Sequence, residues 1–146
     1  AFASHFAPRL LLQALDLYRR LFRPSAELAQ PKVIIGVPLV AAPTDDEAQF
    51  LASSVYQRVL GILHNDRQRL QLPQAGFIES LAPGERAGIA DFLACAVVGG
   101  PDTVRQGFAA LLEATQADEL MLVCDVYEPA LRWRSMEIAA QAMAAL

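Results

Sequence analysis

Two short clusters of residues supply the groups in this sequence that are best suited to chemistry. Ser4 and His5 follow the apolar residues that open the chain, and a histidine titrates near neutral pH, so it is able to take up or release a proton. Gly99 and Gly100 stand directly before Pro101. Two glycines ahead of a helix that begins with proline present free amides and a positive helix end to an anion. The alternatives are that His5 packs at the rim of the fold and that the glycines only make a sharp turn.

A third polar cluster follows the last predicted strand, where Cys124, Asp125, Tyr127 and Glu128 lie close together in the chain. Asp125 either lines a substrate pocket or is a solvated or capping carboxylate. The His, Cys and Asp residues do not have the spacing of metal ligands, and the sequence has no Gly-x-Ser-x-Gly motif. Cys95 and Cys124 lie in apolar runs, which favours two reduced core thiols in a cytoplasmic protein.

The elements that position these residues alternate between strand and helix. An opening strand runs into a helix that reaches Phe22, and Thr44 with Glu47 predicts a capped helix start. Pro38 predicts an end or an irregularity in its strand, because proline has no N–H for a ladder. The periodicity and the turn signals predict strands at 33–40, 95–98 and 119–126, helices at 44–63, 85–93, 101–115 and from 129 onward, and an irregular segment at 64–83.

Strands that alternate with helices predict an α/β fold with a parallel sheet. Four such units are about half of a TIM (β/α)8 barrel, which typically needs about 250 residues, whereas this chain has 146. A complete four-stranded flavodoxin-like layer is the alternative. The chain opens with Ala1 inside an apolar strand, from which we expect a piece of a longer protein.

The composition excludes two classes of partner. The formal charge is −4, with no dense basic cluster, so nucleic acid is not expected. No stretch reaches the roughly 20 apolar residues of a membrane span. Hydrophobic residues make up 54% of the chain and charged residues 19%, more apolar than the usual ~45–50% and ~25%, and this surplus predicts a neighbour that covers apolar surface.

Five motifs in order carry a resemblance that spans nearly the whole chain. The motifs are Phe2–Pro8, Tyr18-Arg19 with Phe22–Ser25, Ala41–Ala48, Val98–Val104, and Asp118–Met121 with Arg132 and Arg134-Ser135. With them the sequence resembles the C-terminal half of bacterial-luciferase-like flavin-dependent monooxygenases.

The resemblance implies a barrel that binds reduced FMN, supplied by a reductase, at the carboxyl ends of its strands and uses O2 on a small organic substrate. It implies that residues 1–146 are one partial barrel domain, units five to eight. The length of the irregular connection separately predicts that 64–84 is a lid or irregular insertion. Ser4 and His5 then lie near the flavin ring, and Gly99 and Gly100 are further cofactor-binding candidates, although the family holds the phosphate mainly in its other half. Pro43 and Glu128-Pro129 depart from the family pattern, which weakens any exact substrate assignment.

Two other interpretations stay open. The chain is alternatively a non-catalytic half-barrel association module, which pairs as a homo-oligomer or with a missing N-terminal half, because exposed strand edges are sticky. A small, complete α/β binding domain is the third interpretation.

Overall fold

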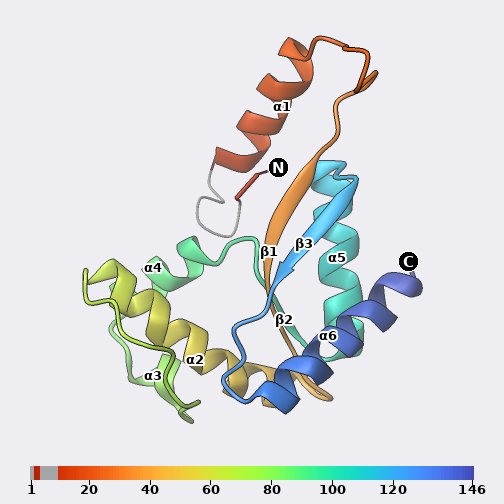
Figure 1. Ribbon diagram of the computed structural model, residues 1–146. Coiled ribbons are helices and arrows are strands. Elements are labelled where there is room, and N and C mark those ends of the chain that lie inside the picture. Colours follow the sequence, from red (N-terminus) through yellow and green to blue (C-terminus); the bar gives the residue numbers. More distant parts are fainter. Residues whose placement is uncertain (1, 4–9) are drawn as a thin grey trace.

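The computed structural model describes residues 2–3 and 10–146, so the predicted site residues Ser4 and His5 lie outside the described residues. Strands and helices alternate as the periodicity predicts. In chain order the elements are α1 (Leu11–Leu21), β1 (Ile34–Ala41), α2 (Asp45–Leu63), α3 (Phe77–Ser80), α4 (Pro83–Phe92), β2 (Val97–Gly99), α5 (Pro101–Thr115), β3 (Glu119–Val123) and α6 (Pro129–Ala144) (Figure 1).

The strands form one parallel sheet in the order β2-β1-β3. Gly36 of β1 pairs with Met121 of β3, and Leu39 of β1 pairs with Val97 of β2. Phe2 makes an isolated parallel bridge to β1, in which its carbonyl accepts from Gly36 N at 3.0 Å. The α/β class and the parallel sheet are therefore confirmed.

The order of the strands departs from the prediction of four consecutive barrel units. Consecutive units would place β2 between β1 and β3, whereas β1 pairs with β3 directly. β2 has three residues and pairs only with the end of β1, at Leu39–Ala41. Residues 34–38 of β1 pair with β3 on the opposite edge.

Pro38 does not end its strand, because β1 continues to Ala41, but the pairing changes there: pairing with β3 ends at Pro38 and pairing with β2 begins at Leu39. Backbone groups of alternate strand residues face the same edge. Gly36 N donates to Phe2 O and Ala42 N donates to Gly99 O, so the nitrogen of Pro38 also faces this edge, between Phe2 and β2. The edge that pairs with β3 loses no donor, which explains how the strand tolerates a proline.

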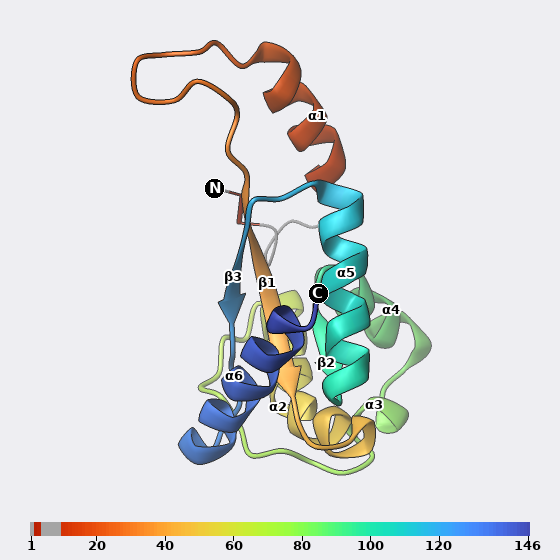
Figure 2. The ribbon, with the colours of Figure 1, turned by 90° about the vertical axis from the view of Figure 1, so that its right-hand side faces the viewer.

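The two faces of β1 have different coverings. Val33, Ile35 and Val37 and the following odd-numbered residues pack in a cluster with α1, α5 and α6, and Figure 2 shows α5 and α6 against this face of the sheet. Val40 and Ala42 point the other way, into a cluster with α2 and α4. We call this second side the inner face. Beyond the cover of α2 and α4 it stays partly open, and Met121 is 58% exposed there.

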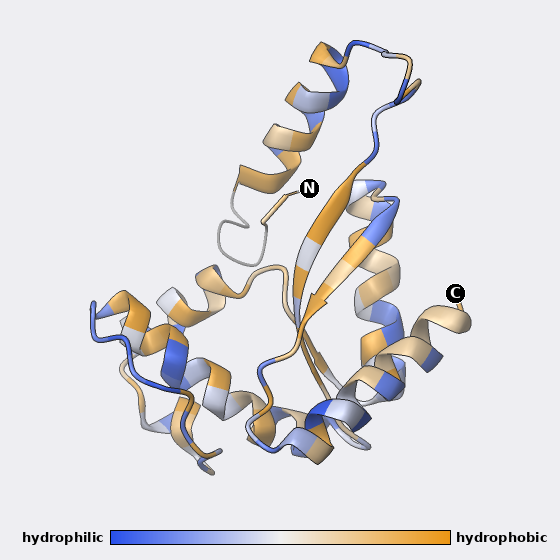
Figure 3. Cartoon of the chain, in the orientation of Figure 1, coloured by the Kyte–Doolittle hydropathy of each residue, from blue (hydrophilic) through white to orange (hydrophobic). Residues whose placement is uncertain are grey.

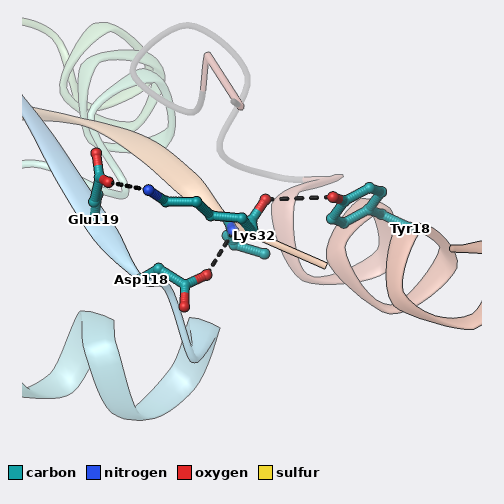
Figure 4. A network of polar contacts seen from close by, with 5 residues as sticks. Tyr18, Lys32, Asp118 and Glu119 are labelled. Atoms are coloured by element: carbon teal, nitrogen blue, oxygen red, sulfur yellow. Dashed lines mark hydrogen bonds and ion pairs between the residues drawn. The ribbon is translucent and has the colours of Figure 1, made fainter. Parts of the chain in front are cut away.

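Polar contacts at the amino ends of β1 and β3 set the register between them (Figure 4). Asp118 Oδ2 accepts from Val33 N at 2.7 Å, Lys32 Nζ pairs with Glu119 Oε1 at 2.5 Å, and Tyr18 donates its hydroxyl to Lys32 O at 3.4 Å. The hydrogen bond to Glu119 raises the pKa of Lys32. Asp118 and Glu119, which belong to one motif of the resemblance, therefore stabilise the pairing of β1 with β3 in this structure.

The segment 64–84, predicted as a lid or irregular insertion, is partly helical. Residues 64–76 lie outside helices and strands, after which α3 and the first residues of α4 follow. Gln74 N donates to Ser53 Oγ at 2.8 Å, and Gln57 Nε2 donates to Leu72 O at 2.9 Å. These bonds attach the segment to α2; its role as a lid stays a prediction.

Candidate site at the carboxyl ends of the strands

The carboxyl ends of β1 and β3 are held by side chains of α6. Ser135 Oγ accepts from Ala41 N at 2.7 Å in a buried position, where β1 has passed the end of β3. Arg132 donates from Nε and Nη2 to Val126 O at 3.0 and 2.8 Å. Both residues belong to the last motif of the resemblance, and both position the chain where parallel strands end, the edge at which α/β folds bind ligands.

Gly99 and Gly100 join three elements at this edge. The Gly100 amide donates to Asp45 Oδ1, in the first turn of α2, at 2.7 Å. Gly99 needs its small size, since a Cβ there would lie 2.4 Å from Thr103 Cγ2 and 2.7 Å from Asp45 Oδ1. The amide that the sequence offers to an external anion thus bonds a carboxylate of the chain itself, and the assignment of both glycines to a cofactor stays a prediction.

The carboxylate of Asp45 is held in its ionised form by these contacts. The amide of Gly100 and then the hydroxyl of Thr103 stabilise the anion, and they lower its pKa below the ordinary value of 3.8. Thr44, the residue before it, caps α2 by accepting from Glu47 N at 3.2 Å, which confirms the predicted helix start.

An ion pair stands on the inner face, at the end of β3. Arg58 of α2 pairs through Nη2 with Asp125 Oδ2 at 2.6 Å, and the two side chains are 34% and 28% exposed. The Nε of Arg58 is buried and has no hydrogen-bond partner. Buried donors are paired in most proteins, so this guanidinium has one donor unused in the arrangement seen here.

The ion pair opens onto a narrow apolar cleft between α2 and the strands. Its wall comes from all three strands and from α2 and α4, and includes Pro38, Val40, Val55, Phe92, Val98 and Val123. Tyr56 also lines it and donates its hydroxyl to Gln49 Oε1 at 2.8 Å. Burial raises the pKa of Tyr56, so this hydroxyl is a hydrogen-bonding group rather than a base at neutral pH.

The structure brings some of the predicted site residues together and not others. Asp125 lines the cleft, and its part in a substrate pocket stays a prediction, whereas Gly99 and Gly100 lie beside the start of α2, where Gly100 bonds Asp45. Arg58 and Tyr56 were not anticipated. Their signal in the sequence is an arginine and a tyrosine within the largely buried stretch 51–59 of a helix.

The described residues contain neither a candidate metal site nor a candidate membrane-spanning helix. Across residues 2–3 and 10–146, no group of three or more His, Cys, Asp or Glu side chains has a geometry that suits a metal ion. No helix in the same residues combines the length and the apolar character required to cross a membrane.

Comparisons with known proteins find relatives along nearly the whole chain, although no family model matches it. The chain is 39% identical over 140 residues to YvbT, an uncharacterized protein of Bacillus subtilis, across 96% of this chain and 42% of that protein. It is 35% identical over 139 residues to a luciferase-like monooxygenase of Escherichia coli, across 95% of this chain and 42% of that protein.

A solved structure has the same fold. The crystal structure of apo-MsnO8 superposes with a TM-score of 0.76 at 25% identity, over 99% of this chain and 44% of that one. This chain therefore spans less than half the length of the relatives that it matches. By this similarity along nearly all of its residues the chain is a homologue of the luciferase-like monooxygenases, consistent with the C-terminal half of a luciferase-like protein.

Proposed function

We propose that this chain forms part of an FMN-dependent monooxygenase, in which the inner face at the carboxyl ends of β1 and β3 contributes to the cofactor and substrate site. The observation that carries the proposal is the 35% identity to a luciferase-like monooxygenase over 95% of the chain. The partly open inner face at the strand ends supports it, because ligands of α/β folds bind at that edge.

The described residues suit the flat ring of a flavin. Met121, 58% exposed, and the partly exposed Pro38 offer apolar surface, and Arg58, whose Nε has no hydrogen-bond partner, lines the cleft together with Pro38. Ser4 and His5 are the further ring contacts that the resemblance implies. A phosphate at Gly100 would have to displace the carboxylate of Asp45 from the amide, so in this proposal the glycines contribute only if Asp45 moves.

When bound and reduced, FMN supplies the electrons for the activation of O2 and the insertion of one oxygen atom into a small organic substrate. The residues of this chain orient the ligands and exclude water. Val40, Val55 and Val123 make the wall of the cleft apolar, while Arg58 and Asp125 offer a donor and an acceptor at its edge.

A titration of oxidised and then of reduced FMN into the purified protein, followed by flavin fluorescence, tests this proposal. We expect saturable binding that weakens in Arg58→Gln and is retained in Gln13→Glu, a control on the exposed face of α1. A titration of FMN into Asp45→Ala tests separately whether Gly99 and Gly100 bind the phosphate. This substitution frees the Gly100 amide, which should then strengthen the binding of FMN. Failure of both redox forms to bind would overturn the assignment of a flavin site to this chain.

A second candidate function is association, and the exposed face of α1 favours it. Leu17 and Leu21 of α1 and Leu10, directly before it, are 49%, 68% and 64% exposed and share one side of a helix that projects from the rest of the molecule (Figure 1). Figure 3 shows the hydrophobic residues along this helix. Such a surface suits a second copy or an N-terminal half-barrel. Analytical ultracentrifugation should show an assembly that Leu17→Glu weakens and that Gln141→Glu, at an exposed position of α6, leaves intact; a monomer at all concentrations would exclude self-association.

A further inference from the structure

A groove much larger than the cleft lies on the other side of α2. It runs between α2, α3 and α4 and has a volume of about 850 Å³, with a wall that includes Phe50, Tyr56, Phe77, Ile78, Ile89 and Leu93. Small-molecule sites have volumes of about 300–1,000 Å³ and are lined mainly by apolar and aromatic side chains. The groove therefore has the size and the lining of a ligand site.

One hydrogen bond and one left-handed turn shape a wall of the groove. Gln74 lines the groove, and its backbone N–H donates to Ser53 Oγ of α2 at 2.8 Å. Gly76 then takes a left-handed conformation, with φ of 69°, directly before α3. This turn leads into Phe77 and Ile78, which form one side of the groove.

The groove is continuous with the candidate site. Tyr56, Leu93, Ala96 and Val98 line both the groove and the cleft. The cleft itself has a free volume of about 20 Å³, enough for about one water molecule. A ligand of ordinary size is thus accommodated by the groove, with Tyr56 between it and the ion pair of Arg58 and Asp125.

The residues around the groove indicate the chemistry of its ligand. Three aromatic side chains, Phe50, Tyr56 and Phe77, line it, and aromatic rings favour stacked or edge-to-face contacts with other rings. Asp46, Glu79 and Arg86 are its charged residues, with one more acid than base, so an anion gains nothing there.

We propose that the groove binds an uncharged, largely aromatic small molecule, with Tyr56 as the contact nearest to the cleft. This proposal deepens the proposed function by naming a substrate class. Only the step that identifies the bound molecule as the substrate rests on the proposed function. Binding itself requires neither flavin nor turnover.

Fluorescence of N-phenyl-1-naphthylamine, an uncharged aromatic probe, tests the proposal in the purified protein without flavin. We expect saturable binding. Ala90 is exposed and lines the groove, so Ala90→Trp should fill the groove and weaken binding by about tenfold. Ala87 is exposed on the same helix and is not part of this lining, so Ala87→Trp should leave the affinity within about twofold. Thermal melts of both variants establish that they are folded.

Two further comparisons test the chemistry. Tyr56→Phe should keep the affinity, because the ring remains, while Tyr56→Leu should weaken it. The sulfonated analogue 1-anilinonaphthalene-8-sulfonate should bind more weakly than the uncharged probe. Absence of saturable binding, equal affinities of the two tryptophan variants, equal affinities of Tyr56→Phe and Tyr56→Leu, or tighter binding of the sulfonate would overturn the proposal. Probe binding without flavin binding would leave it standing while the flavin site fails.

Discussion

A single glycine decides how closely β2 approaches the starts of two helices. Gly99 has no side chain where a Cβ would lie 2.4 Å from Thr103 on α5 and 2.7 Å from Asp45 on α2. Its own carbonyl accepts from Ala42 N at 3.2 Å. Packing therefore requires glycine at position 99. The prediction that Gly99 and Gly100 only make a sharp turn did not include this reason.

Gly99→Ala should consequently lower the free energy of unfolding by about 1–3 kcal/mol, the usual cost of overpacking. Gly84→Ala is the matched control, since nothing lies within 4 Å of the position of its Cβ, and it should change stability by less than about 1 kcal/mol, in the stabilising direction. Urea unfolding of the two variants makes the comparison; equal stabilities would contradict the packing argument.

Asp45 should make stability depend on pH in a defined direction. The pKa of Asp45 is lowered in the folded state relative to 3.8. Its ionised form therefore stabilises the fold at pH values above the pKa that Asp45 has in the unfolded chain. This contribution to stability is lost as the pH falls through the pKa of the folded state.

Asp45→Asn should therefore be less stable than the natural sequence at about pH 7, and the difference should narrow at about pH 3. Urea unfolding at a series of pH values measures it. Thr103→Val removes the second donor to the carboxylate, so it should make the loss of stability begin at a higher pH. A difference between Asp45→Asn and the natural sequence that stays constant with pH would be inconsistent with this role.

At the scale of elements, α6 completes the end of β1. β1 extends to Ala41 but its pairing with β3 ends at Pro38 and Val123, so Ala41 N would be unpaired without the hydroxyl of Ser135, which is fully buried. This bond explains why a polar residue occupies a buried position of α6.

Ser135→Ala should cost about 1–3 kcal/mol of unfolding free energy, the penalty of a buried unsatisfied donor. Ser80→Ala is a suitable control, because Ser80 bonds an exposed carbonyl of its own short helix and should be nearly neutral. The two free energies come from chemical denaturation. A neutral Ser135→Ala would mean that water replaces the hydroxyl at Ala41 N.

At the scale of the whole molecule, β1 is the strand on which the fold is built. It pairs with β2 and β3 on opposite edges, and its side chains enter both buried clusters. Amide hydrogen exchange should be slowest for Ile35, Val37 and Leu39, because exchange there requires opening of both packed sides. Among the described residues, residues 67–72 should exchange fastest. Comparable protection of β1 and β2 would show that the short strand is more strongly held than its three residues suggest.

Local patterns in the sequence were sufficient for most of the elements. Spacing of apolar residues, the cap at Thr44 and the prolines at helix starts act over a few residues, so helices α2, α5 and α6 and the strand at 33–40 could be predicted closely. The five motifs also carried the family resemblance, which the comparisons support. In these respects the sequence by itself determined the class of fold and the family.

Only the tertiary structure decided the order of the strands and the content of the site. The pairing of β1 with β3, the bond between Asp45 and Gly100 and the ion pair between Arg58 and Asp125 join residues far apart in the chain. Contacts of this kind depend on which strand lies beside which and on which face a helix covers, and hydrophobic periodicity reports burial without naming the neighbour. For that reason Asp125 could be suspected from the sequence, whereas its partner Arg58 could not.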